Sequence, residues 1–381
     1  MKPPDVSIEV KPAADVIVFS PVLAPSPTIG RPVMKAAAES AIAPDPAPRA
    51  PGRAKMFWSA AVAWLNRAAA ELWLNIFFWQ ARRHPRFLRA VKAFVVHHTW
   101  RFSEHLYGGT MANAARILGS ASTLAQRETL SRGMLGAFYD FVCDVGSSVG
   151  LSRQQMLGRI ESVEGEHHYR AARDSGPLRK RGAIIVTAHM GSFEVGTAAL
   201  REKEPRVHVL FRRDERGGFE RIRAALRKKL GVIEAPVDDG WTVWLRLRDA
   251  LRNDEVVVIQ CDRVMPGQKG QAVKFFDGHM LLPTGPVRLA LASGAPIIPI
   301  FSVRTASGAI RLFIEEPIVV GETDGALSVD AAMEKVGAVL EKYVRQFPEQ
   351  WLENRPAWIE DAGKPMPRPP GKRWRIFAGA R

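Results

Sequence analysis

The chain has 381 residues, 46% of them hydrophobic, so it is long enough for one large or two ordinary domains with a sizeable core. A net charge of +15 and a pI near 10.2 indicate an acidic partner: nucleic acid, an anionic membrane surface, or an acidic protein or substrate. The two cysteines, Cys143 and Cys261, lack CxxC spacing and are too few for a disulfide framework. This argues against a structural zinc site and favours a reducing compartment.

Residues 1–54 predict a disordered tail. They hold eleven of the 27 prolines, many alanines and nearly balanced charge, a composition that sustains neither a helix nor a packed core. The excess positive charge therefore lies in the part of the chain that we expect to fold. Acids and prolines interrupt the apolar runs at the start, unlike in a secretory signal, so we expect a protein that stays on the cytoplasmic side.

Residues 55–101 predict a membrane-associating helical region. The run MFWSAAVAWLNRAAAELWLNIFFWQ (56–80) has the length of a bilayer-spanning helix, but Arg67, Glu71 and Asn75 would form one polar stripe along it. The next segment, up to residue 101, contains no acid and six bases: Arg82, Arg83, Arg86, Arg89, Lys92 and Arg101. Aromatic anchors beside a basic run are typical of a helix lying in an anionic membrane interface. An ordinary core helix or a transmembrane span are the alternatives.

The remainder predicts an α/β domain over residues 102–365, followed by a basic C-terminal tail, 366–381. The pattern is helical from 103 to 180, and then short β-rich runs alternate with helical stretches. Continuous apolar strands imply a mixed, mostly parallel sheet that helices cover on both faces. The expected strands are 183–188, 206–211, 255–261, 272–276, 296–304 and 309–316, and the expected helices lie near 192–203, 218–230, 241–252, 284–293 and 328–347.

His189 is the first candidate catalytic residue. It follows the apolar run 183–188 in GAIIVTAHMGSFEVG, and in open α/β sheets chemistry collects at the carboxyl ends of strands. An imidazole, with an ordinary pKa of about 6.5, can accept a proton at neutral pH. Glu194 reaches it only if His189 lies in a turn, which Gly191 permits. We expect a general base with an orienting carboxylate, although H-x4-E alone is a weak motif and a structural His and Glu are the alternative.

Two other kinds of site lack their sequence signatures. The chain has no H-E-x-x-H motif, which disfavours a zincin-type metal site. It also has no G-x-S-x-G motif, so no serine nucleophile elbow is present. We therefore expect neither a metal nor a covalent serine intermediate.

Five blocks, in order, resemble those of the bacterial lipid A biosynthesis acyltransferase family, part of the wider lysophospholipid acyltransferase superfamily. They cover roughly residues 110–360 and are GAIIVTAHMGSFEVG, LFRRDERGGFERIRAALRKKLG, VVVIQCDRVMPG, VKFFDGHMLLPTGPVRLALASGAPIIPIFSVR and FPEQWLENRPAW. The sequence departs from the family pattern at three places. Ser192 and Phe193 stand where the family often has Asn and Trp, Arg263 stands where it has Gln, and Glu353 with Asn354 replaces an aromatic and basic pair.

The resemblance implies a monotopic enzyme at the cytoplasmic face of the inner membrane. It would move a fatty acyl chain from acyl-carrier protein, or acyl-CoA, to a hydroxyl of a lipid A-like or other glycolipid acceptor, without metal or cofactor. His189 would be the base and Glu194 its partner. The implied substrate-binding residues are Arg212 and Arg227 for a phosphate or carbonyl, Asp262 as an active-site acid with Arg263 beside it, and Thr284 and Gly285 at a helix N-terminus.

Other functions remain open at this point. The nearest rival is a glycerophospholipid acyltransferase that uses acyl-CoA and a lysophospholipid. A catalytically silent membrane scaffold would keep the amphipathic region but has no reason to keep both His189 and Glu194. Nucleic-acid binding is disfavoured, because no recognised binding module accompanies the positive charge.

Overall fold

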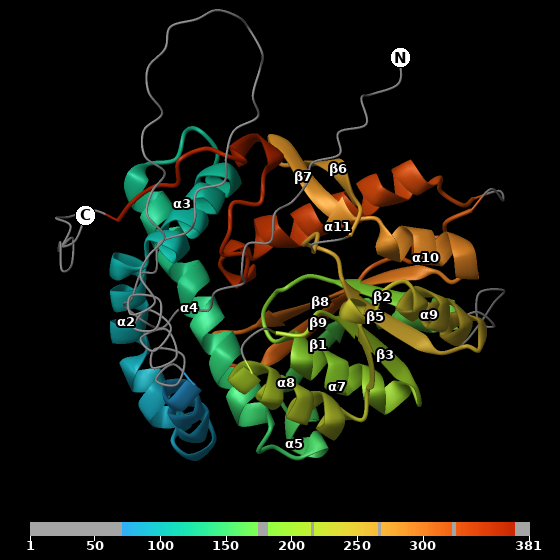
Figure 1. Cartoon of the computed structure of the whole chain (residues 1–381), viewed down its shortest axis with the longest axis horizontal. Coiled ribbons are helices and arrows are strands. Elements are labelled where there is room, and N and C mark those ends of the chain that lie inside the picture. Colours follow the sequence, from blue (N-terminus) through green and yellow to red (C-terminus); the bar gives the residue numbers. More distant parts are fainter. Residues whose placement is uncertain (1–70, 174–181, 215–216, 266–267, 322–324, 370–381) are drawn as a thin grey trace, which may run out of the picture.

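The computed structural model describes residues 71–173, 182–214, 217–265, 268–321 and 325–369. The predicted N-terminal tail and most of the run 56–80 lie outside these residues, as does most of the predicted C-terminal tail. A seven-stranded sheet forms the centre of the molecule (Figure 1). Its strand order is β1 (Ile160–Glu164), β9 (Ile310–Ile314), β8 (Ile297–Arg304), β2 (Ala183–Thr187), β5 (Val256–Gln260), β3 (Val207–Phe211) and β4 (Ile233–Pro236).

The sheet is mixed and mostly parallel, as the sequence predicts. β8 and β9 pair antiparallel, and the other neighbouring strands pair parallel. β2 lies in the middle and is buried along its whole length. Its Ile184 and Val186 side chains join one hydrophobic cluster and Ile185 joins another, so both faces of the sheet are covered.

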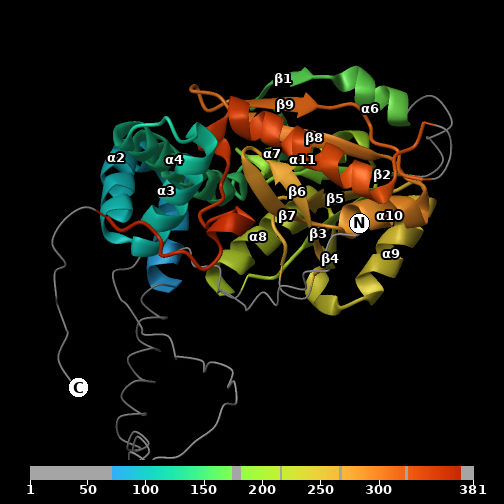
Figure 2. The same cartoon turned by 90° about the horizontal axis from the view of Figure 1, so that it is seen from above.

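Helices form a layer on each face of the sheet (Figures 1 and 2). One layer contains α9 (Thr242–Arg252), α10 (Gly285–Ser293) and α11 (Val329–Gln346). The other contains α5 (Arg153–Leu157), α6 (Glu166–Arg173), α7 (Phe193–Lys203) and α8 (Gly217–Leu230). An antiparallel hairpin, β6 (Gly270–Phe275) and β7 (Gly278–Pro283), packs on α11. The chain then closes through two 3₁₀ turns, Pro348–Gln350 and Ile359–Asp361, with Trp351 and Trp358 buried between them.

The helices that precede the sheet pack together at one side of the molecule (Figure 1). They are a helix whose described part covers 71–83, then α2 (Pro85–Phe102), α3 (Glu104–Leu118) and α4 (Leu124–Ser148). A capping box between Thr123 and Gln126 starts α4. α4 packs against both α2 and α3. It also contacts α8, and this contact joins the helical part to the α/β layers.

Of the polar stripe expected along this helix, Glu71 contacts α8, Asn75 is exposed, and Arg67 lies outside the described residues. Glu71 accepts a hydrogen bond from the backbone N–H of Gly218 and pairs with Arg221, both on α8. Phe78 is buried and stacks on Phe219. These first helices also expose large apolar side chains, which we call the exposed apolar face: Leu72, Trp73, Ile76, Trp79, Phe87, Phe94 and Phe102. Within the described residues, no helix has the length and apolarity needed to cross a membrane.

The expected strands and helices beyond residue 180 are all present, with small shifts at their ends. Three strands were not predicted from the sequence. β1 falls in a region predicted to be helical, and its residues IESVE are half-exposed, so no apolar run marks it. β4 has only four residues, which is too short for its sequence pattern to mark it as a strand. β7 follows β6 after a two-residue turn, so the pattern alone does not separate these two strands.

Candidate active site

His189 and Asp262 meet at one edge of the sheet. β2 and β5 are parallel neighbours, with Thr187 opposite Gln260 in the register. Cys261 N–H donates to the carbonyl of Thr187 at 2.8 Å, which extends the pairing by one step. His189 and Asp262 each follow two residues after the registered pair, so both side chains emerge from the carboxyl ends of adjacent strands.

The Asp262 carboxylate makes hydrogen bonds with the imidazole and the backbone of His189 and with the indole of Trp351. His189 Nδ1 lies 2.8 Å from Asp262 Oδ1, and His189 N–H donates to Oδ2 at 3.1 Å. The indole N–H of Trp351 donates to the same Oδ2 at 3.0 Å. With its proton on Nδ1 facing the carboxylate, His189 presents Nε2 as a proton acceptor. We call these three residues the Trp351–Asp262–His189 array.

The negative charge of this pair resides on Asp262. Burial lowers the pKa of His189 below its ordinary 6.5 and the charge of Arg263 lowers it further, while Asp262 opposes both. Burial alone would raise the pKa of Asp262, but His189, Arg263 and the indole of Trp351 hold it well below its usual range. At neutral pH the site therefore contains a neutral imidazole beside an ionised carboxylate, the state in which histidine accepts a proton.

The turn after β2 requires glycine and is held by the C-terminal part of the chain. Gly191 has φ +53°, and a Cβ there would lie 2.3 Å from the carbonyl oxygen of Ser302. Gly191 N–H donates to Gln350 O at 3.1 Å, and Leu352 N–H donates to His189 O at 2.8 Å. The 350–352 segment thus packs antiparallel on the turn and fixes the backbone of His189.

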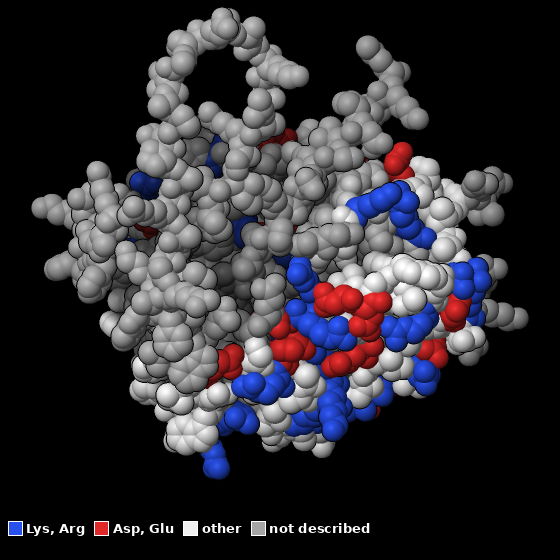
Figure 3. Space-filling view, viewed as in Figure 1, with Lys and Arg blue, Asp and Glu red and all other residues white. Residues whose placement is uncertain are grey.

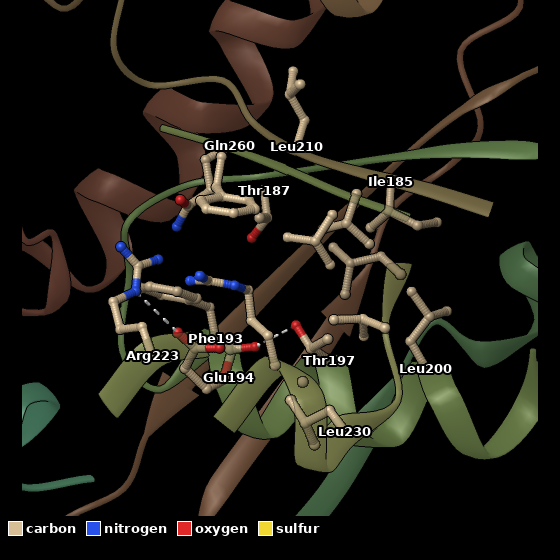
Figure 4. Close-up of a pocket in the computed structure, with 18 of the residues that line it drawn as sticks. Ile185, Thr187, Phe193, Glu194, Thr197, Leu200, Leu210, Arg223, Leu230 and Gln260 are labelled. Atoms are coloured by element: carbon tan, nitrogen blue, oxygen red, sulfur yellow. Dashed lines mark hydrogen bonds and ion pairs between the residues drawn. The ribbon is translucent and has the colours of Figure 1, made fainter. Parts of the chain in front are cut away.

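The structure corrects the expected partner of His189. Glu194 lies in the first turn of α7, buried, and its Oε1 is 3.7 Å from Nε of Arg223 (Figure 4). Burial raises the pKa of Glu194, against the opposing charges of Arg223 and Arg227. The helix begins at Phe193, directly after the turn, and carries Glu194 into the layer between α7 and α8. The strand register brings Asp262, rather than Glu194, to the imidazole.

A pocket opens beside this turn, between the sheet and helices α7 and α8 (Figure 4). Its far end is apolar and includes Ile185, Leu200 and Leu230. Phe193 lines the pocket and also meets the His189 ring edge-on, with 5.9 Å between the two ring centroids. Phe193 therefore connects the pocket to the imidazole. Among the described residues, three buried donor atoms that line it have no hydrogen-bond partner: Arg223 Nε, Arg227 Nη1 and Gln260 Nε2.

Arg227 and Arg212 occupy different surroundings. Arg227 is buried and pairs with Glu220 and with Glu234, the latter at 2.7 Å, while its guanidinium lies 3.9 Å from the ring centroid of Phe211. It therefore lines the pocket as a fixed cation. Arg212 is half-buried, lies 3.7 Å from Asp238 and is not part of the pocket lining.

Thr284 and Gly285 have local packing and hydrogen-bonding roles at the start of α10. The backbone N–H of Thr284 donates to Lys269 O at 3.1 Å, and its hydroxyl donates to the same oxygen at 3.3 Å. A Cβ on Gly285 would lie 2.4 Å from the ring of Trp244, so α10 packs closely on α9 here. The N–H of Thr284, expected to bind an oxyanion or a phosphate, is thus already bonded.

Arg263 lies beside the imidazole and pairs with Glu353, its Nε 2.7 Å from Oε2. Sequence reasoning did not single out Trp351 or the link between Arg263 and Glu353. Trp351 lies in one of the blocks that carry the family resemblance, but an indole N–H gives no signal of its acceptor. Both contacts depend on how the C-terminal segment folds back over β2 and β5.

Comparison with known proteins identifies the family. A family model described as bacterial lipid A biosynthesis acyltransferase matches residues 61–359. The chain belongs to this family. It is also similar to the phosphatidylinositol mannoside acyltransferase of Mycolicibacterium smegmatis, with 21% identity over 252 residues, covering 65% of this chain and 78% of the relative. This match confirms the resemblance found in the sequence blocks. The protein is therefore an acyltransferase rather than a silent scaffold.

Proposed function

We propose that this protein transfers a fatty acyl chain from the thioester of acyl-carrier protein, or of CoA, to a hydroxyl of a lipid A-like or other glycolipid acceptor at the cytoplasmic face of the inner membrane. The observation that carries the proposal is the 2.8 Å contact between His189 Nδ1 and Asp262, which leaves Nε2 as a base. The matched family supplies the reaction class, and the mycobacterial relative acts on a mannoside. Neither a metal nor a cofactor is needed for this chemistry.

The proposed reaction is a direct displacement. Nε2 of His189 takes the proton of the acceptor hydroxyl while its oxygen attacks the thioester carbonyl carbon. The tetrahedral intermediate then collapses, the C–S bond breaks, and the thiolate leaves with the carrier. Asp262 stabilises the imidazolium through Nδ1–H, and the Nε2 proton then passes to the departing thiolate, which leaves as a thiol and restores the neutral ring. A thiolate is a good leaving group, so little acid assistance is required.

The pocket beside Phe193 is suited to the acyl chain of the donor. Its apolar end fits a hydrocarbon, and its polar residues Arg223 and Gln260 carry buried N–H groups that have no hydrogen-bond partner among the described residues. Such donors stabilise a developing oxyanion, because in a site closed to water their dipoles are already oriented. Glu194 then has an indirect role, as the carboxylate that holds Arg223.

The exposed apolar face suits a membrane surface. Trp73 is 68% and Phe94 is 73% exposed, although side chains of this kind are normally buried. Exposed bases lie between them, including Arg83, Arg86 and Arg89. Aromatic side chains that enter the interface while arginines contact anionic headgroups account for both features. We propose peripheral association through this face.

The positive charge suits an acidic donor as well as anionic lipid. Lys and Arg side chains gather on the described face in Figure 3, interspersed with Asp and Glu. In the run from Arg212 to Lys229, several arginines already have acidic partners, such as Arg213 with Asp239 and Arg221 with Glu71. The exposed Lys228 is available to an acidic carrier protein.

Mass spectrometry of lipids from cells with and without this protein tests the proposed function. A glycolipid whose mass falls by one acyl increment when the protein is missing identifies both the chain and the acceptor. Purified protein should then restore the increment with acyl-carrier-protein substrate. Loss of a phospholipid species instead, restored by acyl-CoA and lysophospholipid, would establish the glycerophospholipid acyltransferase.

A further inference from the structure

Half-buried Arg263 and buried Glu353, two residues of opposite charge, join distant segments next to the imidazole. Arg263 directly follows Asp262, and Glu353 directly follows Leu352. Arg263 Nε lies 2.7 Å from Glu353 Oε2, and Arg263 Nη2 donates to Leu352 O at 2.6 Å. The other oxygen of Glu353 accepts the backbone N–H of Arg355 at 2.9 Å and also pairs with the guanidinium of Arg355, whose Nε lies 3.3 Å away. Glu353 is only 4% exposed, so its charge depends on these partners.

Each member of the pair adjoins a residue that contacts His189 directly. Asp262 binds the imidazole, and Leu352 N–H binds the carbonyl of His189. Trp351, one residue further back, donates to Asp262. The Arg263–Glu353 contact therefore joins the end of β5 to the C-terminal segment within one or two residues of every one of these hydrogen bonds.

An ion pair removed from solvent contributes little net stability to the contact between two segments. Desolvation of both charges offsets most of their attraction, and apolar side chains of similar size would often hold the segments as well. Two charged residues that lie far apart in the chain thus meet at one contact.

We propose that Arg263 and Glu353 form a positioning ion pair, which clamps residues 350–355 onto the end of β5 and keeps the Trp351–Asp262–His189 array aligned for proton transfer. This proposal rests on the proposed role of His189 as the base. It assigns Arg263 to holding the site rather than to binding substrate.

The two partners act on the imidazole with opposite signs. The charged groups that face His189 are Asp262 and Arg263 from the segment after β5 and Glu353 from the C-terminal segment, while α7 presents the ring of Phe193. Beyond the effect of burial, Arg263 lowers the pKa of His189 and Glu353 raises it. Loss of Arg263 should therefore raise the pKa of the base, and loss of Glu353 should lower it.

The test uses the full-length protein with Arg263→Gln, Glu353→Gln and the double variant, each assayed for acyl transfer across pH. We expect kcat to fall on the order of 10- to 100-fold in each single variant with little change in KM, because the base is misplaced while the substrate still binds. The acidic limb of the kcat/KM profile should move to higher pH in Arg263→Gln and to lower pH in Glu353→Gln. The double variant should lose less than the product of the single losses and keep a limb near that of the wild type, because the opposite effects of Arg263 and Glu353 on the pKa of His189 are removed together.

A second ion pair provides the matched control. Arg116 binds Asp361 at 2.7 Å and so joins the same C-terminal part of the chain to α3, without contacting the array. Arg116→Gln should lower thermal stability and leave the pH profile unchanged. If one of the Gln variants does not fold, Glu353→Asp takes its place, because it keeps the negative charge but lengthens the contact with Arg263. It should lower kcat, and any shift of the acidic limb should go in the direction expected for Glu353→Gln, to lower pH.

Two results separate this proposal from the proposed function. The pair is only structural if the acidic limbs of the Arg263→Gln and Glu353→Gln profiles move in the same direction or do not move. The same conclusion follows if the kcat values of these variants equal that of Arg116→Gln. Activity in His189→Ala would instead overturn the role of the base itself, whatever the pair does.

Discussion

Asp262 binds Nδ1 of His189 at 2.8 Å, although 73 positions separate the two residues in the chain. The contact follows from the parallel pairing of β2 and β5, and it identifies which of two nearby carboxylates orients the imidazole. Glu194 is close in sequence but lies beside Arg223. This difference leads to the first prediction.

Replacing the two carboxylates should have different consequences. Asp262→Asn removes the charge that stabilises the imidazolium and allows the wrong tautomer, so kcat should fall on the order of 10²- to 10⁴-fold. Glu194→Gln leaves Nδ1 bonded and should alter the rate through Arg223 only, with no displacement of the pH profile. Rate profiles of both variants across pH check this. A profile displaced by Glu194→Gln but not by Asp262→Asn would assign the orienting role to Glu194.

The pH dependence of kcat/KM should reflect a lowered pKa of His189. Burial and Arg263 favour the neutral imidazole, so activity should rise with pH, reach half its plateau below 6.5, and stay level at neutral pH. Asp262→Asn removes an anion that raises this pKa, so its residual activity should reach half-plateau at still lower pH. A wild-type midpoint above 6.5 is incompatible with this environment.

Trp351→Phe should weaken the site more than a comparable change elsewhere. Trp351 and Trp358 are both buried, and their indole N–H groups donate at 3.0 Å to Asp262 and to the carbonyl of Phe275, respectively. Either substitution to Phe should cost about 1–3 kcal/mol of stability through the lost hydrogen bond. Only Trp351→Phe should also lower kcat, because Asp262 loses a partner. Denaturant unfolding and initial rates measure both effects, and equal rates in the two variants would contradict the role of Trp351.

A larger side chain in the pocket should change the preferred acyl chain. Gly196 lies in α7 at the pocket wall, where an added Cβ would make ordinary contacts of 3.5 Å with Leu312 and 3.7 Å with Ser302. Gly196→Ala should therefore fold and favour shorter donors, which competition between acyl-carrier-protein thioesters of different chain length would reveal. An unchanged length preference would place the acyl chain elsewhere.

The exposed apolar face should contribute most of the membrane affinity. Removing Trp73, Trp79 and Phe94 together by substitution with Ala should weaken binding to anionic vesicles, since each buried aromatic contributes about 1.5–3 kcal/mol. Trp241 is 71% exposed directly before α9, a helix that lies across the molecule from α2 in Figure 1, and gives the control Trp241→Ala. Cosedimentation at low and high salt separates the apolar contribution from the electrostatic one. Equal binding by all variants would locate the membrane contact elsewhere.

The sequence predicted the elements well because their signals are local. The apolar runs of β2 and β5 and the periodic helices that follow them need no knowledge of the rest of the chain. His189 could be found at a strand end for the same reason. Its partner could not be found this way, because contact with Asp262 depends on strand order, and a short spacing pointed to Glu194 instead.

The helices before the sheet show the same limit. Periodicity predicts a polar row that contains Glu71 along one side of a helix, but it does not say what Glu71 contacts. Glu71 binds the N-terminal end of α8, so its polarity serves an internal contact. Trp351 and Glu353 were similarly hidden, because a C-terminal segment that folds back over β2 leaves no periodic signal.

The most direct test of the account is the specific activity of His189→Ala, measured with acyl-carrier-protein substrate and normalised to folded protein from its thermal midpoint. Removal of the base should lower acyl transfer on the order of 10²- to 10⁴-fold while the midpoint and vesicle binding stay close to those of the wild type. Normal turnover by a folded His189→Ala protein would contradict the mechanism.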